Sequence, residues 1–70
     1  MEVKSYPNST RIEETRYDRE TGRLEISFVR GGTYEYEGVS IDDYEAMIFS
    51  PSIGKGFNEF IRSKYTGTKI

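Results

Sequence analysis

The sequence predicts an α+β domain in which a three-stranded antiparallel β-meander is followed by two helices packed on one face of the sheet. Up to residue 37, polar and apolar side chains alternate between turns that contain glycine, as they do in half-buried strands. From Ser40 onward, apolar residues recur at three- and four-residue spacing, which is typical of amphipathic helices. We therefore expect the order β-β-β-α-α within one domain over residues 1–70, with a core at about 8–65 and short flexible ends.

The first predicted strand covers residues 11–17, after a lead-in over residues 1–8. Ile12 and Tyr17 are its only large apolar residues, and its other positions are rich in charge. Because charged side chains protect the unpaired edge of a sheet, we interpret it as an edge strand. The following residues, 18–22, end in Gly22 and form a turn.

The second and third predicted strands cover residues 23–29 and 33–37 and carry the clearest alternation. A two-residue loop between them would place Tyr34 and Tyr36 on the face opposite the apolar residues of the second strand. A three-residue loop, residues 30–32 with Gly32 left-handed, would pair Phe28 with Tyr34 and gather the apolar side chains on one face. We favour the three-residue loop for this reason.

The first predicted helix begins at Ser40, whose side chain is a good N-cap. Asp43 stands at the capping-box position, and Val39 with Tyr44 has the spacing of a hydrophobic staple. Pro51 ends this helix.

The second predicted helix runs from Ser52 or Lys55 to Tyr65, and Gly67 terminates it. Its apolar residues recur at helical spacing and form one buried face: Phe57, Phe60, Ile61 and Tyr65.

Cysteine and histidine are absent from the 70 residues. Their absence removes disulfides, the usual zinc ligands and the commonest general base. We therefore expect no catalytic residues, no metal and no cofactor. No apolar run is long enough to span a bilayer, and the first residues do not resemble a signal peptide. We expect a cytoplasmic, bacterial or phage protein that has no membrane partner and is a monomer, since its edge charges oppose self-pairing.

The net charge of −2 is unevenly distributed. Residues 51–70 hold Lys55, Arg62, Lys64 and Lys69 against Glu59 alone, whereas residues 1–50 are acidic overall. A basic end on an acidic body points to an anionic partner at that end, although a solvated helix surface would have the same composition.

The chain resembles the KTSC family, a short domain named after the C-terminal extension of certain lysyl-tRNA synthetases and found also as free-standing small bacterial and phage proteins. The resemblance covers roughly residues 8–65, and it departs from the family pattern at Ser40, where a proline is expected, and at Gly56, where a bulkier residue is usual. It implies the fold; RNA binding is a suggestion drawn from the synthetase context, and no activity is implied. The residues that carry it are Asn8-Ser9-Thr10-Arg11-Ile12, Tyr17-Asp18, Leu24-Glu25-Ile26-Ser27-Phe28, Gly32-Thr33-Tyr34-Glu35-Tyr36-Glu37-Gly38-Val39, Ser50-Pro51-Ser52-Ile53-Gly54-Lys55-Gly56-Phe57-Asn58, Ile61-Arg62 and Tyr65.

The segment that opens the second helix is the first candidate binding site. Free backbone N–H groups at a helix start, flexible glycines and a lysine can together hold a phosphate or carboxylate. The alternative is a glycine-rich connection with a solvated lysine. The candidate residues here are Ser52, Gly54, Lys55, Gly56, Asn58, Arg62 and Lys64.

Tyr34 and Tyr36 form the second candidate site. As a stacking platform, each ring would contribute about 1–3 kcal/mol per base. The alternative is that both rings belong to the core beneath the helices, which the favoured register supports.

Taken together, these features predict a non-enzymatic binding module, with RNA or another nucleic acid as the first candidate partner by family analogy. A protein–protein adaptor that binds a host or cognate protein is the second.

Overall fold

The computed structural model describes residues 2–5 and 11–70, with side chains from Arg11 onward. Residues 1 and 6–10 lie outside this part, and with them half of the expected lead-in and the first residues of the resemblance. The element order is β1 (Glu2–Ser5), β2 (Ile12–Asp18), β3 (Arg23–Phe28), β4 (Gly32–Tyr36), α1 (Ile41–Ile48), α2 (Ile53–Gly56), the π-helix η1 (Phe57–Arg62) and β5 (Gly67–Lys69). The α+β class with an antiparallel sheet and two helical segments is confirmed.

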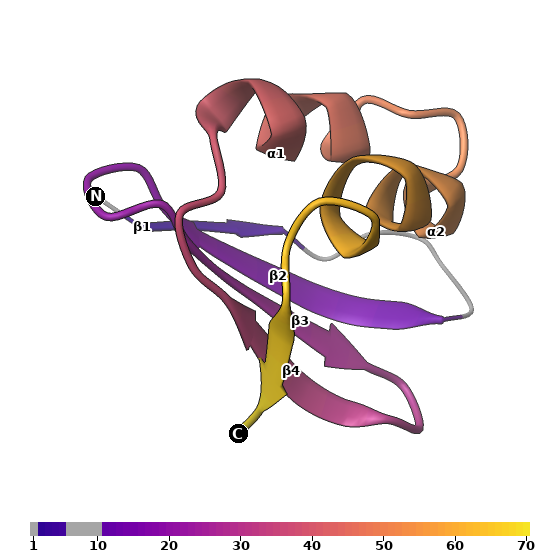
Figure 1. The fold of residues 1–70 in the computed structure, drawn as a ribbon. Helices are drawn as coiled ribbons and strands as arrows, with labels where there is room; N and C mark the ends of the chain where they lie inside the picture. The colour runs from indigo at the N-terminus through magenta and orange to yellow at the C-terminus, as the bar shows by residue number, and fades with distance from the viewer. Residues whose placement is uncertain (1, 6–10) are drawn as a thin grey trace.

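The sheet has five strands in the order β1-β2-β3-β4-β5, and every neighbouring pair is antiparallel. The helices lie between β4 and β5 in sequence and cover one face of the sheet (Figure 1). The predicted three-stranded meander is therefore the centre of a wider sheet. Residues 67–69, which were expected to terminate a helix and form a flexible end, instead add the strand β5 beside β4.

The charges of β2 led us to expect an edge strand. That prediction is wrong, because β1 pairs along the outer side of β2. A register shift between Ile12 and Glu14 marks a β-bulge in β2. The extra residue explains how Ile12 and Tyr17, five positions apart, both point into the core, since strict alternation would place them on opposite faces.

The β3–β4 hairpin places both tyrosines on the helix-covered face, as the three-residue loop predicted. The pairing differs by two residues from the expected one: Ile26 faces Tyr34, and Phe28 faces Gly32. A shift of two leaves every side chain on its predicted face. Gly32 does have a positive φ of 79°, which agrees with its predicted left-handed conformation.

Helix α1 begins as predicted. The Ser40 side chain accepts a hydrogen bond from the Asp43 backbone N–H at 3.1 Å. The reciprocal half of the capping box is replaced by Tyr65: the Ser40 N–H donates to the Tyr65 hydroxyl at 3.2 Å, and this hydroxyl donates to Asp43 Oδ2 at 2.7 Å. Lys64 Nζ lies 3.0 Å from Asp43 Oδ1. The segment after η1 is thereby fastened to the start of α1.

The second helical segment is shorter than predicted, because it ends at Arg62 and Tyr65 leaves it to bond α1. Gly56 lies where this segment crosses α1, and a Cβ there would be 2.8 Å from the Met47 carbonyl oxygen. The core lies between the helices and the sheet and consists of Ile12, Tyr17, Leu24, Ile26, Tyr36, Val39, Tyr44, Met47, Phe57 and Ile61.

Candidate functional site

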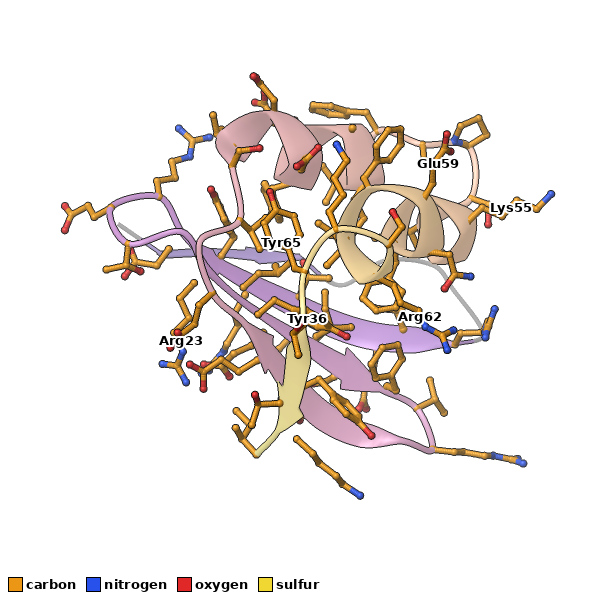
Figure 2. All side chains as sticks on the ribbon, viewed as in Figure 1. Arg23, Tyr36, Lys55, Glu59, Arg62 and Tyr65 are labelled. Carbon is orange, nitrogen blue, oxygen red and sulfur yellow. The ribbon has the colours of Figure 1, made fainter. Side chains whose placement is uncertain are left out.

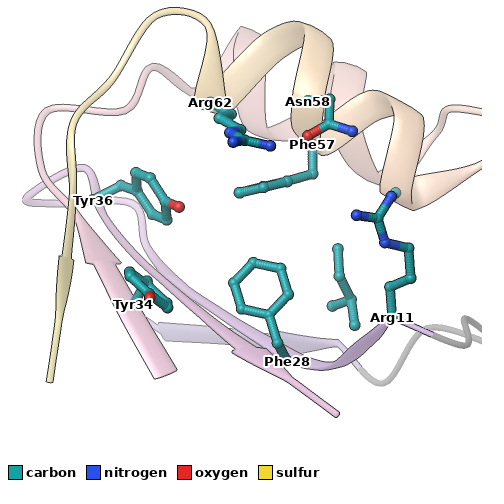
Figure 3. A pocket seen from close by; sticks show the side chains of 9 residues that line it. Arg11, Phe28, Tyr34, Tyr36, Phe57, Asn58 and Arg62 are labelled. Atoms are coloured by element: carbon teal, nitrogen blue, oxygen red, sulfur yellow. The ribbon is translucent and has the colours of Figure 1, made fainter. Parts of the chain in front are cut away.

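A pocket of about 270 Å³ opens between η1 and the adjoining end of the sheet (Figure 3). Its residues come from the start of β2, the last residue of β3, the strand β4 and the second helical segment. They are Arg11, Ile12, Phe28, Tyr34, Tyr36, Gly54, Phe57, Asn58 and Arg62.

Four aromatic rings form the inner walls of the pocket. Phe28 packs edge-on against Tyr34 and Phe57, with ring centroids 5.8 and 5.4 Å apart, and Phe57 packs edge-on against Tyr36 at 5.7 Å. Edge-to-face packing of this kind is favourable and holds the rings in fixed orientations. The pocket therefore has a preformed apolar wall for a planar ligand.

The rim of the pocket carries positive charge. Among the described residues that line it, Arg11 and Arg62 are the charged ones, and no carboxylate is present. Asn58 lies between them at the mouth (Figure 3). The Arg11 side chain passes over Gly54, where a Cβ would lie 3.7 Å from Arg11 Cδ. Two guanidinium groups around an apolar hollow favour an anionic ligand with a flat apolar part.

Tyr36 presents its hydroxyl group to the pocket while its ring is buried, with 5% of the residue exposed (Figure 3). Burial raises the pKa of the Tyr36 phenol, neighbouring Tyr34 also raises it, and the Arg62 guanidinium partly opposes both. The phenol is therefore neutral at physiological pH and can donate or accept a hydrogen bond. The ring is packed against Gly67 of β5, where a Cβ would lie 2.6 Å from it.

The π-helical turn places Arg62 at the pocket. Phe57 and Arg62 are five residues apart, and in an α-helix of 3.6 residues per turn they would point about 140° apart. A π-helix bonds residue i to residue i+5 and so stacks these positions on one side. Because Phe57 faces the core, the π-turn brings Arg62 over the same pocket.

The structure brings five of the predicted candidates together at this pocket: Tyr34, Tyr36, Gly54, Asn58 and Arg62. It separates the other four. Lys55 extends into solvent, away from the sheet (Figure 2). Lys64 is paired with Asp43.

At the start of the second helix, where the anion site was predicted, the Ser52 side chain caps one backbone N–H group. Ser52 Oγ accepts from the Lys55 N–H at 3.4 Å, and the Ser52 carbonyl accepts from the Gly56 N–H at 2.9 Å. Gly56 is buried against α1. The predicted anion site at this helix start stays a prediction.

Four lining residues were not among the predicted candidates: Arg11, Ile12, Phe28 and Phe57. Once the strand register is known, Phe28 is seen to lie on the same face of the sheet as Tyr34 and Tyr36. Phe57 lies on the predicted apolar face of the second helix. Arg11 gave no signal, because a basic residue at the start of a charged strand resembles ordinary edge protection.

Comparison with known proteins agrees with this fold. The family model described as the KTSC domain matches residues 8–65. The chain belongs to the KTSC domain family. The crystal structure of a KTSC domain protein from Yersinia pestis superimposes with a TM-score of 0.90 at 31% identity and covers 100% of this chain and 99% of that one.

Curated relatives place the KTSC domain in proteins of different lengths. Lysine–tRNA ligases of Trichormus variabilis and Nostoc punctiforme are each 36% identical over 59 residues, which is 84% of this chain. The chain spans only 10% of the length of these ligases. An uncharacterized protein of Stutzerimonas stutzeri is 30% identical over 57 residues, which cover 81% of this chain and 80% of that protein.

Two features are absent from the described part of the chain. No helix there is long and apolar enough to cross a membrane. Within residues 2–5 and 11–70, no group of three or more histidine, cysteine, aspartate or glutamate side chains is arranged to hold a metal ion.

Proposed function

We propose that this KTSC domain is a non-catalytic RNA-binding module and that the arginine-rimmed aromatic pocket is its binding site. The observation that carries the proposal is the combination of aromatic side chains, of which Phe28 and Tyr34 are half-buried, with Arg11 and Arg62 in one hollow, and no carboxylate is among its described lining residues. Aromatic rings stack on nucleobases, and guanidinium groups bind phosphates. The ligases that share the domain act on tRNA by name, which supports RNA as the nucleic acid.

The proposed module is a cytoplasmic monomer. The described residues that line the pocket include no nucleophile paired with a base, which supports binding rather than catalysis.

An NMR titration of the labelled domain with a short single-stranded RNA, at low and at physiological salt, tests the proposal. We expect salt-sensitive shifts at Arg11, Asn58 and Arg62. With two arginines on phosphates, the logarithm of the association constant should fall with that of salt concentration at a slope of about −1.4. Arg62→Gln should reduce that slope by about 0.7.

Lys55→Gln is the matched control, because it removes a cation of the same helical segment that lies outside the pocket. It should leave the pocket shifts unchanged. An absence of shifts at low salt, or equal losses in the two variants, would contradict the proposal and leave the protein–protein adaptor as the function to pursue.

A further inference from the structure

The size of the pocket limits what part of an RNA enters it. At about 270 Å³ it is smaller than typical sites for drug-sized ligands, which measure about 300–1,000 Å³. A hollow of this size suits a ligand on the scale of a single nucleotide better than a longer stretch of chain. Its aromatic rings are fixed by their edge-to-face contacts, so the pocket does not need to widen or close to receive a base.

The polar groups of the pocket suit a base with its attached phosphate. The Tyr36 hydroxyl and the Asn58 amide can each donate and accept hydrogen bonds, which matches the mixed donors and acceptors on the edge of a base. The guanidinium groups of Arg11 and Arg62 lie at two sides of the mouth, where the sugar–phosphate chain would leave the pocket (Figure 3).

The opposite face of the sheet does not extend this cationic footprint. There, Arg23 (labelled in Figure 2) is held by Glu25 at 3.1 Å and by Glu35 at 3.2 Å. On the same face, Arg16 lies 3.4 Å from Glu14. Each of these arginines is matched by at least one carboxylate, so this face does not attract a polyanion. Within the described residues, the pocket rim is where guanidinium groups lie beside aromatic rings.

These features distinguish between paired and unpaired RNA. Extracting a base from a duplex costs a few kcal/mol. Stacking returns only about 1–3 kcal/mol per base, and two arginines are far fewer than the 6–10 phosphate contacts of typical duplex-binding proteins. The free energy of binding a base in the pocket therefore does not exceed the cost of first extracting that base from a duplex.

We infer that the pocket takes a single unpaired nucleotide, with the base against the aromatic walls and its phosphate at the arginine rim. This inference rests on the proposed function and makes it narrower: the domain recognises RNA at a bulge, a loop or a free end and does not bind a regular duplex.

The test compares two RNAs of equal length, an unstructured single strand and a blunt duplex, by fluorescence anisotropy and NMR at one salt concentration. We expect the single strand to bind at least tenfold more tightly and to shift the pocket residues. Equal affinity for both RNAs, with shifts at the pocket, would overturn the inference and leave the proposed function standing. Binding of neither RNA would overturn both.

A second measurement examines the role of the base. Adenosine 5′-monophosphate should shift Tyr36, Asn58 and Phe57, and inorganic phosphate at the same concentration should not. Tyr36→Phe, which keeps the ring and removes the hydroxyl, should weaken single-strand binding about three- to tenfold. Shifts of the same size and place with inorganic phosphate would show a simple anion site and overturn the inference.

Discussion

Two glycines of the same helical turn should respond in opposite ways to alanine. At Gly56 a new Cβ would lie 2.8 Å from both the Met47 carbonyl oxygen and Ser50 Cβ, and backbone atoms cannot rotate away. At Gly54 the nearest atoms are Arg11 Cδ at 3.7 Å and Ser52 Oγ at 4.0 Å, which is ordinary contact. Gly56→Ala therefore forces α1 and α2 apart, and Gly54→Ala does not.

The magnitude follows from two terms. Alanine gains about 0.8–1 kcal/mol over glycine in a helix at either site, and overpacking at Gly56 costs about 1–3 kcal/mol. The helix term is shared, so the two variants should differ by about 1–3 kcal/mol in their free energy of unfolding. For a domain of this size that corresponds to a difference of about 4–24 °C in Tm.

Thermal unfolding followed by circular dichroism, without ligand, measures this difference directly. We expect Gly54→Ala to melt above the parent protein and Gly56→Ala well below Gly54→Ala. Equal Tm values would show that α1 and α2 do not pack as closely as the structure has them, and would refute the reasoning.

Three further expectations concern the C-terminal strand and its attachments. Gly67→Ala should push the Tyr36 ring aside and weaken RNA binding, measured by fluorescence anisotropy. An unchanged RNA affinity, with unchanged NMR shifts of the pocket residues, would contradict this. Tyr65→Phe should lower the free energy of unfolding in urea by about 1–2 kcal/mol, because it removes the hydrogen bonds from the Tyr65 hydroxyl to the start of α1. An unchanged urea midpoint would argue against a stabilising role for these hydrogen bonds. The Tyr65 hydroxyl, and then Lys64, hold the pKa of Asp43 below its ordinary value of 3.8. That stabilisation is complete above the ordinary value and is lost as pH falls through the folded pKa, so Asp43→Asn should flatten the acid limb of a stability–pH profile. An identical limb in parent and variant would exclude Asp43 as the titrating group.

The central part of the fold was predictable because it depends on local patterns. Alternation identified β3 and β4, and Ser40 with Val39 and Tyr44 located the start of α1. The outer strands were not, because residues 2–5 and 67–69 are short and polar and form strands only by pairing with a neighbour. The bulge in β2 was not predictable either, so the sequence did not show that Ile12 and Tyr17 lie on the same face of the sheet.

The pocket was predictable only in part. Tyr34, Tyr36 and Arg62 were recognised by residue type, but nothing in the sequence showed that they meet. Their meeting depends on a hairpin register and on a π-turn, and neither leaves a distinct pattern along the chain. Arg11 reaches the site from a distant part of the sequence through the sheet.

The π-turn also has a consequence for chain length. A π-turn contains one residue more than an α-turn that covers the same arc, and Glu59 is exposed within this one. Deleting Glu59 would turn η1 into an α-helix in which the arginine follows Phe57 by four positions, only about 40° away around the axis. The arginine would still face the pocket. Family members that are one residue shorter here can therefore keep the same site, so such a deletion does not by itself indicate that the site is lost.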